Sequence, residues 1–189
     1  MDPLAPLDSA SNEFRSRLAS ITPAQWELPT DLGEWTVRGL IDHVIGANRM
    51  SVVLLGGGTR EEAIASMGAS IADTDLMQAF DETTIAQRAA FAAPGAFEKI
   101  VPHPAGDIPG GRLFGFRLVD LTVHAWDLAR ATGGDLELNP MIVSSLWDTL
   151  SPSAAHLVAT GVFGEGASGA VAEDAPLQDR LLDMLGRRP

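Results

Sequence analysis

Glycine and proline divide this chain into long segments in which apolar residues recur at helical spacing. Signals that end helices occur at Pro23, at the triplet Gly56-Gly57-Gly58, at Pro94-Gly95 and at Gly133-Gly134. The intervals between them carry no internal repeat and no series of short alternating strands. This pattern predicts an all-α protein, an antiparallel four-helix bundle with additional short C-terminal elements.

The caps and breakers give approximate bounds for the four long helices. The first covers about residues 7–21, the second follows the N-cap Thr36 and ends at Gly56, the third begins at Thr74 or Asp75 and ends at Pro94, and the fourth covers about residues 112–132. The proline- and glycine-rich segment 96–111 is expected to be a loop with a short extended piece at residues 97–101.

Two shorter helices are expected after the fourth. Asn139 and Pro140 supply an N-cap and a first-turn proline for a fifth helix, which Pro152 interrupts. Residues 175–188 are expected to form a short amphipathic helix. Its apolar LLDML run would either pair two copies into a homodimer or cover the chain's own core.

Composition and charge limit the domain organisation, the binding partners and the chemistry that this chain can have. The chain has 189 residues, 46% of them hydrophobic, which is enough core for a single domain over residues 1–189. A formal charge of −12 argues against nucleic acid and anionic membranes as partners. With no cysteine, a thiol nucleophile and a cysteine-ligated zinc site are excluded. The sequence lacks a signal peptide pattern and a long apolar run, which predicts a cytoplasmic protein.

The expected fourth helix carries the first candidate site. Asp120 and His124 are four residues apart, so they lie on the same helix face. A carboxylate and an imidazole in this register can bind one metal ion, although the same pair is also a common helix contact. Arg117 and Asp127 extend this charged face, whereas the apolar residues at 116, 119, 123 and 126 are expected to face the core.

His43 is the second candidate, in the apolar stretch LIDHVIGAN, where an unpaired imidazole would be costly. It is either a hydrogen-bonded core histidine or a third metal ligand. Gly39, Gly46 and Ala47 lie about one turn away and would let another helix or a ligand approach closely. Two histidines and one carboxylate from two helices leave coordination positions open, as in catalytic metal sites. Zinc, iron(II) and nickel all suit these donors.

The remaining histidines and tryptophans are weaker candidates. His103 is interpreted as a flexible surface residue that could otherwise line a pocket mouth, and His156 as structural. Trp35, Trp126 and Trp147 are expected in the core, with Trp126 near enough to the candidate site to form a wall.

Three stretches together are similar to a known family. They are WTVRGLIDHV at 35–44, RLVDLTVHAWDLARATG at 117–133 and APLQDRLLDMLGRRP at 175–189. They resemble the actinobacterial branch of the DinB-like superfamily, specifically the metal-binding domain of mycothiol-dependent maleylpyruvate isomerase and its relatives. The resemblance implies a four-helix bundle that holds a divalent ion, usually zinc, on His43, Asp120 and His124. The family commonly has Glu at the position of Asp120.

The resemblance also implies a chemistry. Its metal would bind a low-molecular-weight thiol such as mycothiol and present the thiolate to a small electrophilic substrate, in a thiol transferase or isomerase reaction. The isomerase has a further C-terminal domain that these 189 residues lack, so an unassigned relative is expected. The alternatives are a hydrolase that uses metal-activated water and a non-catalytic metal- or small-ligand-binding bundle.

Two charged residues near the candidate ligands have open roles. Arg117, or a residue near His103, would hold an acidic substrate, or Arg117 would only support Asp120 from within the helix. Asp127 would be either a partner of His124 or a solvated helix residue.

Overall fold

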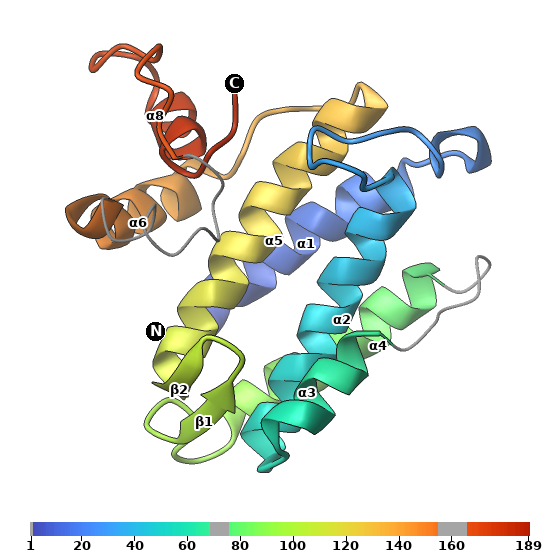
Figure 1. Cartoon of the computed structure of the whole chain (residues 1–189), viewed down its shortest axis with the longest axis vertical. Helices are drawn as coiled ribbons and strands as arrows, with labels where there is room; N and C mark the ends of the chain where they lie inside the picture. The colour runs from blue at the N-terminus through green and yellow to red at the C-terminus, as the bar shows by residue number, and fades with distance from the viewer. Residues whose placement is uncertain (1, 69–75, 155–165) are drawn as a thin grey trace. The chain divides into compact units, whose positions relative to one another are not determined.

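The computed structural model describes residues 2–68, 76–154 and 166–189, and it is mostly helical, as predicted (Figure 1). The chain forms two compact units, residues 1–136 and 137–189. The expectation of a single domain over the whole chain stays a prediction. Within the described residues, every helix is too short or too polar to cross a membrane.

Four helices of the first unit form the predicted bundle. They are α1 (Ala5–Ala19), α2 (Val37–Gly56), α4 (Leu76–Ala92) and α5 (Gly110–Thr132). Helix α2 packs against α4 and α5, and α1 packs against α4 and α5 (Figure 1). Fully buried side chains from all four helices fill the interior, among them Phe14, Ile41, Phe80 and Leu121. Their burial supplies the main favourable free energy of folding.

Helix α2 begins and ends where the sequence predicts. The Thr36 side chain accepts a hydrogen bond from the backbone N–H of Gly39, which satisfies one of the donors left free at a helix start. Gly57 ends the helix with φ 94°, a left-handed conformation that glycine adopts without strain. The expected start of the third helix at Thr74 or Asp75 lies outside the described residues.

A short 3₁₀ helix, η1 (Pro23–Gln25), a further α-helix and a β-hairpin are elements of this unit that the sequence did not predict. Helix α3 (Arg60–Met67) begins with a capping box, in which Thr59 and Glu62 each bond the other's backbone N–H. The segment interpreted as a loop contains an antiparallel hairpin, β1 (Ile100–His103) and β2 (Gly106–Pro109). The extended piece expected at residues 97–101 overlaps only its first strand. A two-stranded hairpin tolerates prolines because each strand has an unpaired edge.

The second unit contains α6 (Pro140–Leu150), the 3₁₀ turn η3 (Ser151–Ser153) and α8 (Leu177–Met184). The Asn139 side chain accepts a hydrogen bond from Met141 N–H, as expected for an N-cap, and α6 ends just before Pro152. The apolar side chains of the LLDML run are buried, which favours the interpretation that they cover the chain's own core. His156 lies outside the described residues.

Candidate metal centre

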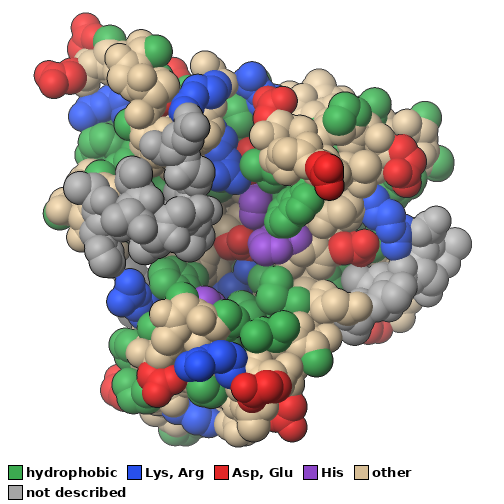
Figure 2. Space-filling model, viewed as in Figure 1, with side chains coloured by type: hydrophobic (Ala, Val, Ile, Leu, Met, Phe, Trp, Pro, Cys, Tyr) green, Lys and Arg blue, Asp and Glu red, His purple; other side chains and the backbone are tan. Residues whose placement is uncertain are grey.

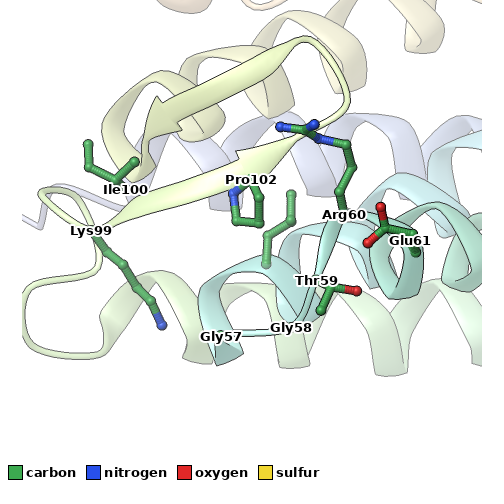
Figure 3. Close-up of a pocket in the computed structure, with 9 residues that line it drawn as sticks. Gly57, Gly58, Thr59, Arg60, Glu61, Lys99, Ile100 and Pro102 are labelled. Atoms are coloured by element: carbon green, nitrogen blue, oxygen red, sulfur yellow. The ribbon is translucent and has the colours of Figure 1, made fainter.

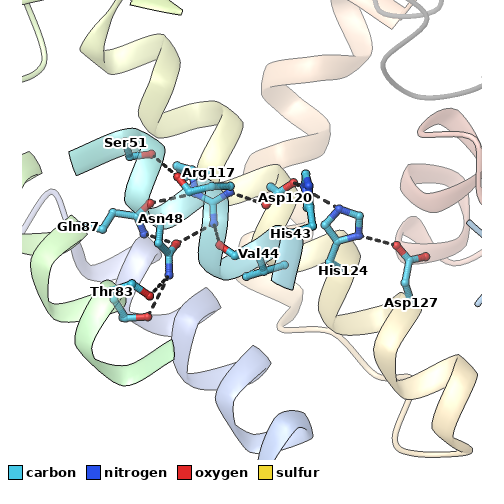
Figure 4. A network of polar contacts seen from close by, with 12 residues as sticks. His43, Val44, Asn48, Ser51, Thr83, Gln87, Arg117, Asp120, His124 and Asp127 are labelled. Carbon is cyan, nitrogen blue, oxygen red and sulfur yellow. Dashed lines mark hydrogen bonds and ion pairs between the residues drawn. The ribbon is translucent and has the colours of Figure 1, made fainter. Parts of the chain in front are cut away.

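Helices α2 and α5 bring three predicted ligands together. His43 comes from α2, and Asp120 and His124 lie one turn apart on α5 (Figure 4). One ligand atom from each lies within 4.8 Å of the other two. The Nε2 atoms of His43 and His124 are 3.1 Å and 3.3 Å from the same oxygen, Asp120 Oδ1. His43 therefore has an acidic hydrogen-bond partner, which agrees with both of its interpretations, the hydrogen-bonded core histidine and the metal ligand.

The two oxygens of Asp120 have different neighbours. Oδ1 faces both imidazoles, whereas Oδ2 accepts a short hydrogen bond from Arg117 Nη1. Burial by itself would raise the pKa of Asp120, but Arg117 and the two histidines hold that pKa well below its usual value of 3.8. Asp120 is thus an anion at neutral pH, with one oxygen directed at the imidazoles.

His124 is held by a second carboxylate. Its Nδ1 lies 2.9 Å from Asp127 Oδ2, and the Asp127 side chain is only 3% exposed. A carboxylate at Nδ1 favours the tautomer with its proton on that nitrogen, which leaves the Nε2 lone pair facing Asp120 and His43. The interpretation of Asp127 as a solvated residue is wrong because α5 packs this face inward.

Arg117 is also buried, with 3% of its side chain exposed. Beyond Asp120, its guanidinium donates to Gln87 Oε1 at 2.9 Å and to Asn48 Oδ1 at 2.8 Å (Figure 4). These contacts occupy the guanidinium inside the protein, so the expectation that Arg117 holds a substrate is not supported. Its alternative role, support of Asp120, agrees with the geometry.

Trp35 lies at the candidate site and not in the core. Its side chain was expected in the core, but it is 38% exposed and lies just before α2. The indole centroid lies 4.8 Å from the His43 ring and 6.1 Å from the His124 ring. Trp35 therefore forms an aromatic wall beside the two histidines. Trp126 is buried as predicted, and Arg130 lies over its ring.

His103 takes no part in this cluster. It lies on β1, half-buried, with its ring centroid 5.4 Å from that of Phe116, which is itself only partly buried. Burial, together with the positive charges of Arg60 and Arg112, lowers the pKa of His103 below its ordinary value of 6.5. The structure places His103 on β1, partly exposed, and its interpretation as a flexible surface residue stays a prediction.

A separate pocket of about 500 Å³ lies at the end of α2 and contains none of the three candidate ligands (Figure 3). Lys99, the only lysine of the chain, lines it with Arg60 and Pro102. Lys99 Nζ donates to the Leu55 carbonyl at 2.6 Å. This bond caps the C-terminal end of α2.

The donor set fits a divalent ion. Two imidazole nitrogens and one carboxylate oxygen are the ligand types found in three-ligand zinc sites that keep an open position. The side chains of His43, Asp120 and His124 are 25%, 20% and 11% exposed. Figure 2 shows histidine and acidic side chains side by side at the surface. The three side chains are therefore partly open to solvent. The second oxygen of Asp120, Oδ2, is bonded to Arg117.

Comparison with known proteins gives consistent matches. Residues 7–129 match the family model described as the mycothiol maleylpyruvate isomerase N-terminal domain. The chain is 31% identical over 192 residues to uncharacterized proteins from two strains of Mycobacterium tuberculosis, CDC 1551 and H37Rv. These alignments cover 99% of this chain and 98% of each relative.

Solved structures agree with these matches. Two crystal structures of mycothiol-dependent maleylpyruvate isomerase, one of a histidine-to-alanine mutant, match with TM-scores of 0.60 and 0.57. Each match covers 82% of this chain and 68% of the isomerase chain, at 18% and 16% identity. At this identity, the likeness shows a shared fold.

Proposed function

Because this chain belongs to the mycothiol maleylpyruvate isomerase N-terminal domain family, we propose that it binds one divalent metal ion through His43, Asp120 and His124. The observation that carries the proposal is the convergence of three ligand atoms within 4.8 Å of one another, from two packed helices. Zinc is the first candidate, with nickel and iron(II) suited to the same donors.

The proposed reaction uses a thiol that the protein does not supply. An ion at this site would act as a Lewis acid and lower the pKa of a bound thiol. The chain has no cysteine, so the sulfur must come from a small molecule. Since the solved relatives are mycothiol-dependent, we propose a thiol of the mycothiol class that reacts with a small electrophilic substrate, in a transferase or isomerase reaction.

The residues around the ligands support this role. Asp127 orients His124 so that Nε2 points inward, and Arg117 occupies Asp120 Oδ2 so that Oδ1 is the oxygen left for an ion. Trp35 supplies an exposed apolar surface beside the ligands, against which a bound small molecule can pack.

Elemental analysis of the purified protein tests the metal site. We expect about one equivalent of metal in the wild type after incubation with zinc, and loss of the metal in His43→Ala and His124→Ala. His103→Ala is the matched control because this histidine lies outside the cluster and should leave the metal content unchanged. Wild-type protein that stays metal-free would refute the proposal.

Cobalt(II)-loaded protein tests the thiol. A thiol that binds the ion adds a sulfur-to-cobalt charge-transfer band in the near ultraviolet, so titration with a small thiol should produce that band and His124→Ala should abolish it. Turnover of an electrophile should then require the thiol. Turnover without thiol would instead indicate a metal-activated-water hydrolase. Metal binding without a thiol band or turnover would indicate a non-catalytic metal-binding bundle.

A further inference from the structure

The buried polar groups behind Arg117 link a third helix to the candidate metal centre. Gln87 on α4 and Asn48 on α2 are both fully buried. Neither residue is near enough to touch an ion held by the three candidate ligands, because Arg117 and Asp120 lie between (Figure 4). Their hydrogen bonds therefore reach the site through Arg117.

The hydrogen bonds define how both amides are oriented. Arg117 Nε donates to Gln87 Oε1, and Arg117 Nη2 donates to Asn48 Oδ1. Gln87 Nε2 donates to the same Asn48 oxygen at 2.9 Å, while Asn48 Nδ2 lies 3.2 Å from Thr83 Oγ1. Turning either amide over would place an NH₂ group against the guanidinium, so each oxygen must face Arg117.

This arrangement leaves Arg117 little freedom. A buried guanidinium needs acceptors for its five N–H groups, and its plane is fixed once two of its nitrogens bond to oxygens on separate helices. The Val44 carbonyl, 3.4 Å from Nη2, is a further acceptor. The remaining nitrogen, Nη1, is directed at Asp120 Oδ2. The position of Asp120 therefore depends on α4, which contributes no metal ligand.

We propose that Gln87 and Asn48 are positioning residues for the metal centre, which act through Arg117 to hold Asp120 Oδ2 and so restrict Asp120 to binding the ion through Oδ1 alone. One-oxygen binding keeps a coordination position open for an exchangeable ligand. The inference rests on the proposed function, since it requires that Asp120 bind the ion.

Zinc affinity, measured by competition with a chromophoric chelator, tests this inference with Gln87→Met. Methionine fills nearly the same volume but offers no strong acceptor for Arg117. We expect zinc affinity to fall by about tenfold, the lower end of the effect of removing a partner that orients a metal ligand. The cobalt(II) absorption bands should also change, because Asp120 is then free to bind through both oxygens.

Ser51→Ala is the matched control. Ser51 is buried on α2 one turn from Asn48, and its hydroxyl donates to the Ala47 carbonyl rather than to the network. Both variants remove a buried polar group and can lower the melting temperature. Only Gln87→Met should change zinc affinity and the cobalt(II) spectrum. If Gln87→Met does not fold, Gln87→Asn, whose amide is one methylene shorter, should change both readouts in the same direction.

A double-mutant cycle tests the route of the effect. In an Arg117→Met background, which retains all three candidate ligands, Gln87→Met should cause no further loss of zinc affinity. An additional tenfold loss in that background would overturn the proposal, as would a folded Gln87→Met protein with wild-type affinity and spectrum. A wild-type protein that binds no metal would instead refute the proposed function itself, so the two failures are distinguishable.

Discussion

Asp120 and Asp127 are two acidic residues on α5 that contact different ring nitrogens of His124. Asp120 faces the Nε2 atoms of both histidines, whereas Asp127 lies against Nδ1 of His124. The first position suits a metal ligand, and the second suits a group that fixes the tautomer and ring orientation of a ligand. Residue type alone does not separate these roles, but geometry does.

Asp127→Ala should therefore weaken zinc binding without removing a ligand. We expect a loss of about 10- to 100-fold in affinity, because the His124 ring would lose its orienting partner. Asp127→Asn should be milder, since the amide oxygen can still accept from Nδ1. Asp31→Ala is the control, as Asp31 is 72% exposed and pairs with Arg130 on the surface. Equal affinities for all three variants would contradict the role given to Asp127.

Zinc affinity should also depend on pH through His124. Burial lowers the pKa of His124, but the charges and hydrogen bonds of Asp120 and Asp127 outweigh burial and raise the pKa above its usual value of 6.5. Protonated imidazole cannot bind metal, so affinity should fall as pH decreases through this raised pKa, by up to about tenfold per pH unit. Asp120 stays ionised throughout this range because its pKa is lowered.

Chelator competition between about pH 8 and pH 5.5 measures this dependence across the range in which histidine titrates. Asp127→Asn should move the onset of the decline to lower pH, because one of the charges that raises the pKa of His124 is removed. An affinity that stays constant over this range would show that His124 does not bind the ion.

At the scale of elements, α2 and α3 approach one another at a glycine. A Cβ atom added at Gly46 would lie 2.8 Å from the carbonyl oxygen of Met67 and 3.0 Å from its Cα. The same addition at Gly39 meets only Thr36 Oγ1 and Trp35 Cβ, at 3.7 Å and 4.0 Å. Of the small residues that flank His43, Gly46 thus admits another helix, which is one of the two alternatives that the sequence left open.

Gly46→Ala should destabilise the metal-free protein by about 1–3 kcal/mol, because the backbone of α3 must move to relieve the overlap. Gly39→Ala should be neutral or stabilising by up to about 1 kcal/mol, since alanine favours the helix and has room there. Urea denaturation of the two variants makes the comparison. Similar effects from both substitutions would show that α3 does not pack closely against α2.

The sequence predicted those parts of the site that lie within one helix. Asp120 and His124 follow from their spacing of four residues, and α2 followed from its cap at Thr36 and its glycine end. The orientation of Arg117 could not be predicted, because it depends on Gln87 and Asn48, which are 30 and 69 positions away along the chain. Such contacts exist only once α2, α4 and α5 have packed.

The structure also differs from the sequence-based expectations at α3, at the hairpin and at Trp35. The capping box at Thr59 and Glu62 was present in the sequence and would have indicated α3. The prolines of the segment 96–111 indicated a loop, although proline also occurs in edge strands such as those of this hairpin. Trp35 was assigned to the core because its hydrophobic character alone does not show whether a side chain packs in a core or lines a binding site.

At the scale of the whole molecule, the family match and the candidate site fall in the same unit. The family model covers residues 7–129, and unit 1 covers residues 1–136. This match confirms the resemblance inferred from the sequence. The candidate ligands, Asp127 and the network around Arg117 all lie inside unit 1 as well.

A fragment of residues 1–136 should therefore fold and bind metal with the stoichiometry of the full chain. It retains α1, α2, α4 and α5, whose buried side chains form the bundle core, together with the three candidate ligands, Arg117 and Asp127. Circular dichroism and zinc titration of the fragment and the full chain make the comparison, with His124→Ala in the fragment as the control. An unfolded fragment would show that residues 137–189 are required for stability, and the interpretation of residues 1–189 as one domain would then be supported.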